Sequence, residues 1–219
     1  MAGPLKVAVL ISGRGSNLQA LIDAFPKGAA SPVQIVLVVS NRPDAQGLER
    51  ADKAGLKTEV IDHKSFASRE DFDVAMDREI RAAGAEFIVL AGFMRLLTEG
   101  FINAWKNRMI NIHPALLPAF PGLDTHRRAL EAGVKFHGCT VHFVRHETDT
   151  GPIIGQAVVP VLPADDEAAL AARVLRVEHQ LYPLALRLVA EGKVRVDGER
   201  AFVDGASTVD GTMFNPAIA

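Results

Sequence analysis

The chain has 219 residues, of which 48% are hydrophobic and 23% charged, so it is long enough to bury one large core or two smaller ones. Its formal net charge of -2 gives no reason to expect a nucleic-acid partner or a general attraction to acidic membranes. The single cysteine, Cys139, excludes an internal disulfide and a metal cluster built from several cysteines.

Neither end of the chain carries a recognisable membrane or export signal. The first apolar run, Val7 to Ile11, is short and leads into a glycine loop, so we expect no signal peptide. No apolar stretch approaches the roughly 20 residues that span a bilayer. We therefore expect a cytoplasmic protein without a membrane partner. Residues 206–219 are small and polar with little periodicity, which predicts a loose tail.

A strand, a glycine loop and a helix open the chain. Lys6–Ser12 is a continuous apolar run, typical of a parallel strand covered on both faces, and an amphipathic helical pattern follows Gly13–Asn17. Glycines let the backbone approach a ligand, and free amides at a helix start favour an anion. Leu18 replaces the third glycine of a dinucleotide fingerprint, and no P-loop lysine is present. The loop indicates a cradle for a single phosphate, or glycines that serve only the geometry of the turn.

Strands and helices continue to alternate through the first half. We predict strands over 33–40, 58–61 and 87–91, a helix over 45–54 with Asp44 as N-cap, and a helix from Ser68 to Ile80 with Ser68 and Asp71 as a capping pair. This alternation predicts an α/β fold with a doubly wound, mostly parallel sheet. Ligands bind beyond the carboxyl ends of such strands, so we expect the glycine loop, Gly92–Leu97 and Asn111–His113 to meet there.

Two polar residues interrupt the apolar segment Met109–Pro118. Asn111 and His113 are two apart, so in an extended strand they point to the same side, and Pro114 should end the pairing. An amide can donate to a carbonyl oxygen that gains charge, and a histidine can carry a proton, so the pair suits acyl transfer. The alternative is that both are satisfied structural groups. Likewise, Arg95 either orients a flat polar ligand or faces solvent.

The second half supplies a carboxylate for the histidine. We predict a short helix over 124–132 closed by Gly133, a strand over 139–144 with one exposed face, and a strand over 153–159. Asp149 lies in the acidic loop between these strands, where it either stabilises a His113 imidazolium or simply forms the turn. Either Leu117-Pro118 or Phe120-Pro121 is a candidate cis bond.

The longest helical pattern runs from Asp165 to Glu191, and Tyr182-Pro183 should kink or break it. Glu178 and His179 precede that point. A small hairpin is predicted from 194–196 and 201–203, across Asp197-Gly198.

Taken together, these motifs resemble the glycinamide ribonucleotide transformylases, a family of folate-dependent formyltransferases of purine synthesis. The matching segments are Ile11–Leu18, Ser68–Glu70, Leu90–Leu97, Asn111–Pro118, Pro121-Gly122, Val141–Val144, Asp149, Gly151-Pro152, Glu178-His179 and Tyr182-Pro183. They cover nearly the whole chain in order. The resemblance implies one formyltransferase domain over residues 1–205, with a nucleotide-binding half (1–100) and a folate and catalytic half (101–205).

The resemblance also implies a role for each matching residue. Asn111, His113 and Asp149 would be the catalytic triad, and 10-formyltetrahydrofolate the formyl donor, with no metal. The phosphoribosylglycinamide site would consist of Gly15, Ser16, Asn17 and Glu178. The folate site would consist of Arg69, Met94, Arg95, Leu96, Leu97, Asn111 and Val144. The partners would be small molecules, and the protein a monomer or homodimer.

The chain departs from the family pattern at three positions. Thr150 follows Asp149 where many relatives have a small residue, which puts the closing of that loop over the pterin in question. Leu175 stands where some members place a polar residue near the phosphate, so the loop amides would carry more of the binding. Ala115 replaces a common serine, with little expected effect.

Three other functions compete with this one. Methionyl-tRNA formyltransferase shares the catalytic core but should add a basic C-terminal domain, which we do not expect here. A 10-formyltetrahydrofolate hydrolase shares the triad but should add an N-terminal regulatory domain. A non-catalytic nucleotide-binding protein would keep the glycine loop but has no reason to bring Asn111, His113 and Asp149 together.

Overall fold

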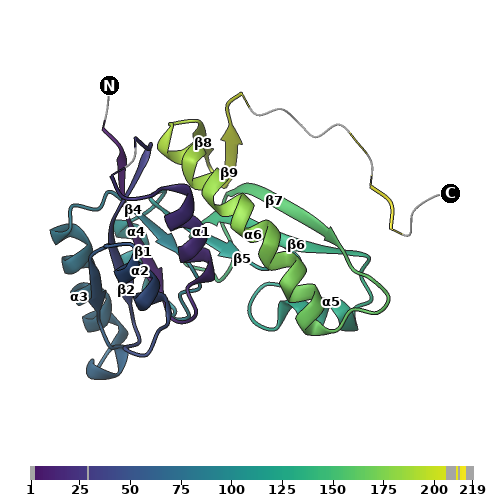
Figure 1. Cartoon of the computed structure of the whole chain (residues 1–219), viewed down its shortest axis with the longest axis horizontal. Coiled ribbons are helices and arrows are strands. Elements are labelled where there is room, and N and C mark those ends of the chain that lie inside the picture. Colours follow the sequence, from purple (N-terminus) through teal and green to yellow (C-terminus); the bar gives the residue numbers. More distant parts are fainter. Residues whose placement is uncertain (1–2, 29, 206–210, 212, 216–219) are drawn as a thin grey trace.

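A computed structural model describes residues 3–28, 30–205, 211 and 213–215, and it shows a three-layer α/β arrangement (Figure 1). Seven strands form one sheet in the order β3-β2-β1-β4-β5-β6-β7. The first five strands in this order are parallel, whereas β6 pairs antiparallel with β5 and with β7. The strands are β1 (Leu5–Ile11), β2 (Val33–Ser40), β3 (Thr58–Val60), β4 (Phe87–Leu90), β5 (Met109–His113), β6 (Phe136–Phe143) and β7 (Ile153–Pro160). The predicted mostly parallel, doubly wound sheet is confirmed.

Helices cover both faces of the sheet because its central strands are apolar on both. Val9 of β1 packs into one core and Leu10 into the other, since successive side chains in a strand point to opposite faces. The first core lies against α1 (Ser16–Ala24) and α6 (Glu167–Ala190), and the second against α3 (Arg69–Ala82) and α4 (Glu99–Ala104). The shorter elements are α2 (Gly47–Lys53), α5 (Thr125–Glu131) and the single-turn 3-10 helix η1 (His63–Ser65).

Helix ends in the first half test two capping predictions. The Ser68 hydroxyl accepts a hydrogen bond from the Asp71 amide (3.0 Å), so the predicted cap of α3 is confirmed. The prediction for Asp44 was wrong: α2 begins at Gly47, and the Asp44 carboxylate instead pairs with Arg42 (2.8 Å). Helix α4 was not predicted, because only six residues carry its pattern.

Two predictions in the second half were also wrong. Strand β6 is buried on both faces rather than exposed on one, because α6 packs on one side and residues 115–117 and Thr150 contact Thr140 and His142 on the other. Pro183 does not break α6, which continues to Ala190. Tyr182, fully buried one residue earlier, donates its hydroxyl proton to the Leu90 carbonyl (2.8 Å) and lies 3.2 Å from the Ile110 carbonyl. The helix is therefore held against the end of β4 and the start of β5 at this point.

Several smaller features complete the fold. The predicted hairpin is confirmed as β8 (Val194–Asp197) and β9 (Arg200–Val203). Gly133 (φ +66°) closes the turn after α5, and the cis bond is Leu117-Pro118. No helix in the described residues is long and apolar enough to cross a membrane. The predicted loose tail, residues 206–219, lies largely outside the described residues.

Candidate active site

His113 and Asp149 form a buried pair at the end of β5. His113 is 4% exposed, and its Nδ1 lies 3.3 Å from Asp149 Oδ1. Its Nε2 donates a hydrogen bond to the Phe120 carbonyl (2.9 Å). Both ring nitrogens therefore face acceptors: Nε2 is hydrogen-bonded to a carbonyl, and Nδ1 lies within ion-pair distance of the Asp149 carboxylate. Asp149 is fixed independently, because its Oδ2 accepts the Gly122 amide (2.7 Å). Its backbone has φ +54°, so it also serves the turn.

Asn111 lies on the same side of β5 and is held by a histidine that sequence reasoning did not assign. Its Nδ2 lies 3.3 Å from Nε2 of His142, the residue directly opposite in the antiparallel register. His142 Nδ1 faces the Phe143 and Thr150 carbonyls (3.0 and 3.1 Å), so it carries the proton and Nε2 accepts. Burial lowers the pKa of His142, which keeps the ring neutral. This bond leaves the second Asn111 amide hydrogen available to a ligand.

The glycine loop lies where β1 joins α1 and opens onto a cavity. Gly15 adopts φ +70°, and a Cβ there would lie 2.5 Å from the Gly47 Cα. Gly47, which sequence reasoning missed, donates its amide to the Gly13 carbonyl (3.0 Å) and lets α2 press against the loop. The adjoining cavity of about 460 Å³ is lined by Gly13, Arg14, Gly15, Ser16, Asn17, Ala91, Gly92, Pro114, His126, Ala168, Ala171, Ala172, Leu175 and Glu178. It therefore reaches from the loop to the residue that follows His113.

Glu178 of α6 completes this cavity from the opposite wall. It is 6% exposed, and its Oε2 accepts a hydrogen bond from Asn17 Nδ2 (2.8 Å). Burial raises the pKa of Glu178, while the Asn17 bond opposes that shift. The cavity therefore contains a poorly solvated carboxylate that can accept hydrogen bonds from ligand hydroxyl groups.

We expect Glu178→Gln to stabilise the fold at neutral pH and to weaken nucleotide binding. The raised pKa means that the ionised form is disfavoured in the folded state, so the variant should gain in free energy of unfolding above that pKa. The gain should vanish as pH falls through the raised pKa, because both side chains are then neutral. The KM for the nucleotide should rise about tenfold, since a charged acceptor is lost. Urea unfolding at two pH values and nucleotide titrations measure both effects.

Glu191→Gln, at the exposed C-cap of the same helix, is the control for this prediction; its surface ion pair with Lys193 should contribute little. It should show neither effect, and a Glu178→Gln variant with the same unfolding free energy as the wild type at both pH values would contradict the account.

The residues predicted to bind folate lie on the 92–98 loop, at the start of α3, in β5 and directly after β6, and they differ in exposure. Met94 and Leu96 are 67% and 61% exposed, an unusual state for large apolar side chains next to a site. Leu97 is instead buried in the core, so it would line a pocket only in part. Arg95 lies 4.8 Å over the Phe72 ring. Val144 is half-buried, and Arg69 is exposed at the start of α3. These placements leave the folate assignment a prediction.

Two polar side chains that sequence reasoning missed hold the 92–98 loop. The Ser12 hydroxyl accepts the Met94 amide (2.7 Å) and donates to Asn41 Oδ1 (2.6 Å). Asp73, 3% exposed on α3, accepts the Thr98 amide (2.7 Å) at the start of α4. Burial raises the pKa of Asp73. The loop is thus anchored at both ends before any ligand binds.

Two further histidines lie near His113 and Asp149. His126 and His137 contact edge to face, with ring centroids 5.3 Å apart, and His126 also lines the cavity. Burial lowers the pKa of His137 to about 4, so this ring stays neutral. Across the described ranges, we find no group of three or more histidine, cysteine, aspartate or glutamate side chains that could hold a metal ion.

A mostly parallel sheet with an anion cradle, and with an amide, an imidazole and a carboxylate at its carboxyl edge, defines an acyl-transfer site on a nucleotide-binding scaffold. The comparison with protein families agrees with this class: a family model described as formyl transferase matches residues 5–186. The chain belongs to the formyl transferase family.

Several individual proteins are similar to this chain over most of its length. The phosphoribosylglycinamide formyltransferase of Escherichia coli K12 is 46% identical over 201 residues, covering 92% of this chain and 94% of the relative. The human trifunctional purine biosynthetic protein adenosine-3 is 48% identical, over 87% of this chain but only 19% of its own length. The crystal structure of glycinamide ribonucleotide transformylase 1 from Symbiobacterium toebii superposes with a TM-score of 0.89 at 47% identity, covering 93% of this chain and 95% of that one. The chain thus spans less than a fifth of the trifunctional relative.

Proposed function

We propose that the protein transfers the formyl group of 10-formyltetrahydrofolate to the amine of phosphoribosylglycinamide, in purine biosynthesis. The observation that carries the proposal is the single cavity that begins at the glycine loop and ends at Pro114, next to the His113–Asp149 pair. A nucleotide bound by its phosphate at the loop would present its far end to the catalytic residues. The comparisons support the same reaction, because the relative matched over nearly its full length is named for it.

Each part of the cavity has a role in binding the nucleotide. Gly15, Ser16 and Asn17 form the N-terminus of α1, and the free backbone amides there favour a phosphate. The Glu178 carboxylate lies across the cavity and would accept hydrogen bonds from the ribose hydroxyls. Leu175 adds no charge, so phosphate binding rests on the loop amides. The folate would lie against Met94 to Leu97, Arg69 and Val144, on the neighbouring strand ends.

The reaction then follows from the positions of three side chains. The substrate amine attacks the formyl carbon, a new C–N bond forms, and the formyl oxygen gains negative charge. The free amide hydrogen of Asn111 and a protonated His113 stabilise that oxygen. The bond to N10 of the folate then breaks, and the proton lost by the amine passes to N10, through His113 or water. Asp149 stabilises the imidazolium throughout. Nδ1 of His113 faces Asp149, and Nε2 is hydrogen-bonded to the Phe120 carbonyl. Nε2 must therefore give up the Phe120 contact before it can reach the substrate.

The test is the absorbance change as 10-formyltetrahydrofolate loses its formyl group, with and without phosphoribosylglycinamide. We expect deformylation only when the nucleotide is present, with formylated nucleotide as product. Loss of the formyl group at the same rate without nucleotide would favour the second candidate, a 10-formyltetrahydrofolate hydrolase, which the same triad supports. The proposal includes small-molecule partners only, a cytoplasmic location, and a monomer or homodimer.

A further inference from the structure

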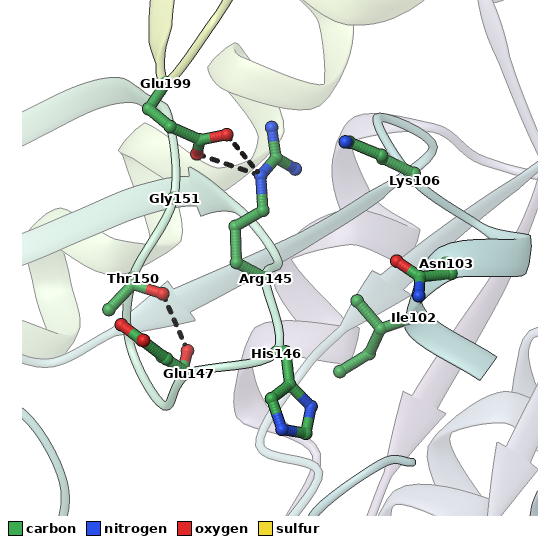
Figure 2. A pocket seen from close by; sticks show the side chains of 9 residues that line it. All are labelled: Ile102, Asn103, Lys106, Arg145, His146, Glu147, Thr150, Gly151 and Glu199. Atoms are coloured by element: carbon green, nitrogen blue, oxygen red, sulfur yellow. Dashed lines mark hydrogen bonds and ion pairs between the residues drawn. The ribbon is translucent and has the colours of Figure 1, made fainter. Parts of the chain in front are cut away.

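The loop that carries Asp149 is not packed against the helix next to it. A hollow of about 480 Å³ separates residues 145–151 from α4, and its walls are Ile102, Asn103 and Lys106 on one side and the loop on the other (Figure 2). The loop side chains of His146 and Glu147 are exposed. Apolar burial therefore contributes little to fixing this loop, and polar contacts must do so.

Arg145 supplies three of those polar contacts. Its Nε donates to the Glu199 carboxylate (2.9 Å), in the turn between β8 and β9 (Figure 2). Its Nη2 donates to Asn107 Oδ1 (2.9 Å), in the turn before β5, and its Nη1 to the Val144 carbonyl (3.1 Å). The Arg145 side chain is 14% exposed, whereas Glu199 is 65% exposed. One planar guanidinium thus joins the loop to two segments far away in the sequence.

The segment between Arg145 and Asp149 transmits this anchorage. The Thr150 hydroxyl donates to the Glu147 carbonyl (2.8 Å), and the Thr150 carbonyl is held by His142. At Gly151 (φ +113°), an added Cβ would collide with the Phe143 carbonyl and lie 2.9 Å from Arg145 Cγ, so the loop base is tightly closed. Asp149 has its own contacts to Gly122 and His113, so Arg145 adds a second anchor at the start of the same loop.

We propose that Arg145, with Glu199 and Asn107, is a positioning residue that holds the 144–151 loop closed, with Asp149 against His113, before the folate binds. The proposal rests on the proposed function for its catalytic consequence. With the loop already ordered, the folate need not supply that ordering on binding.

The kinetic test compares Arg145→Ala, Arg145→Lys and Glu199→Gln. We expect Arg145→Ala to raise the KM for 10-formyltetrahydrofolate about tenfold, with the KM for the nucleotide unchanged. Arg145→Lys keeps the positive charge but loses the planar set of guanidinium donors, so it should raise this KM by less than Arg145→Ala does. Glu199→Gln should raise this KM by about two- to threefold, because Glu199 is exposed. Asp197→Asn, in the same hairpin and paired with Arg195 at 3.5 Å, is the matched control and should have no effect.

A second measurement needs no substrate. The Gly122 amide is bonded to Asp149 Oδ2, so its hydrogen exchange reports whether Asp149 stays in place. We expect faster exchange at Gly122 in Arg145→Ala but not in Asp197→Asn. Unchanged Gly122 exchange and unchanged folate KM in Arg145→Ala would overturn the proposal. Suppose that Gly122 exchanges faster in Arg145→Ala and that the wild-type protein transfers no formyl group. The anchoring role of Arg145 would then be supported, and the proposed function would fail.

Discussion

Replacing His113 with alanine is expected to lower kcat for formyl transfer by about 10²- to 10⁴-fold, the contribution of a positioned acid–base group. His113 contacts both the Asp149 carboxylate and the Phe120 carbonyl, so alanine removes the acid–base group from this network. The KM for the nucleotide should change little, because the glycine loop and Glu178 lie at the other end of the cavity. Steady-state rates at saturating substrates, with a thermal melt to confirm folding, measure this effect.

A double variant tests whether His113 and Asp149 act as one unit. Asp149→Asn keeps the shape of the side chain but removes the charge that stabilises the imidazolium, so kcat should fall substantially on its own. Combined with His113→Ala, it should cause little further loss, since groups that act together are not additive. Multiplicative losses in the double variant would show that Asp149 acts independently, through Gly122 or the loop, and not through His113.

Gly15→Ala is expected to lower the free energy of unfolding by about 2–4 kcal/mol and to abolish nucleotide saturation in the assay. The backbone at Gly15 has φ +70°, and the new methyl group would lie 2.5 Å from the Gly47 Cα. Backbone cannot move aside as a flexible side chain does, so α2 or the loop must shift. That shift would misalign the amides that are proposed to bind phosphate. Urea unfolding and nucleotide titration are the measurements.

Gly13→Ala provides the matched comparison in the same loop. At Gly13 no atom of the described chain lies within 4 Å of an added Cβ, so the unfolding free energy should stay within about 0.5 kcal/mol of the wild type. Equal destabilisation by the two variants would indicate that loop flexibility in general, rather than the contact with Gly47, sets the cost.

The fold was predictable from sequence where a strand consists of apolar residues buried on both faces. β1, β2 and β4 are covered on both faces, so their apolar runs are continuous and the parallel sheet follows. The prediction of an exposed face for strand β6 was wrong because residues 139–144 alternate in polarity although both faces are buried. Its polar members, Thr140 and His142, face hydrogen-bond partners instead of water. Tertiary contacts of this kind have no local signal.

The site was predictable in part for a similar reason. Asn111 and His113 share a face through the two-residue period of β5, and Asp149 reaches His113 as expected. His142 was missed because its contact with Asn111 depends on the antiparallel register of β5 and β6, which the sequence does not reveal. Gly47 and Asp73 were missed because each acts on a loop more than 20 residues away. The roles in substrate binding stay predictions.

Helix α6 limits how this protein can be recombined with its relatives. It packs on α1, bonds the glycine loop through Glu178 and Asn17, and holds the end of β4 and the start of β5 through the Tyr182 hydroxyl. The N-terminal strands therefore depend on a helix near the other end of the chain. A chimera that exchanges residues 1–100 for those of a relative must also exchange α6. Otherwise the new glycine loop will pack against a helix from a different protein.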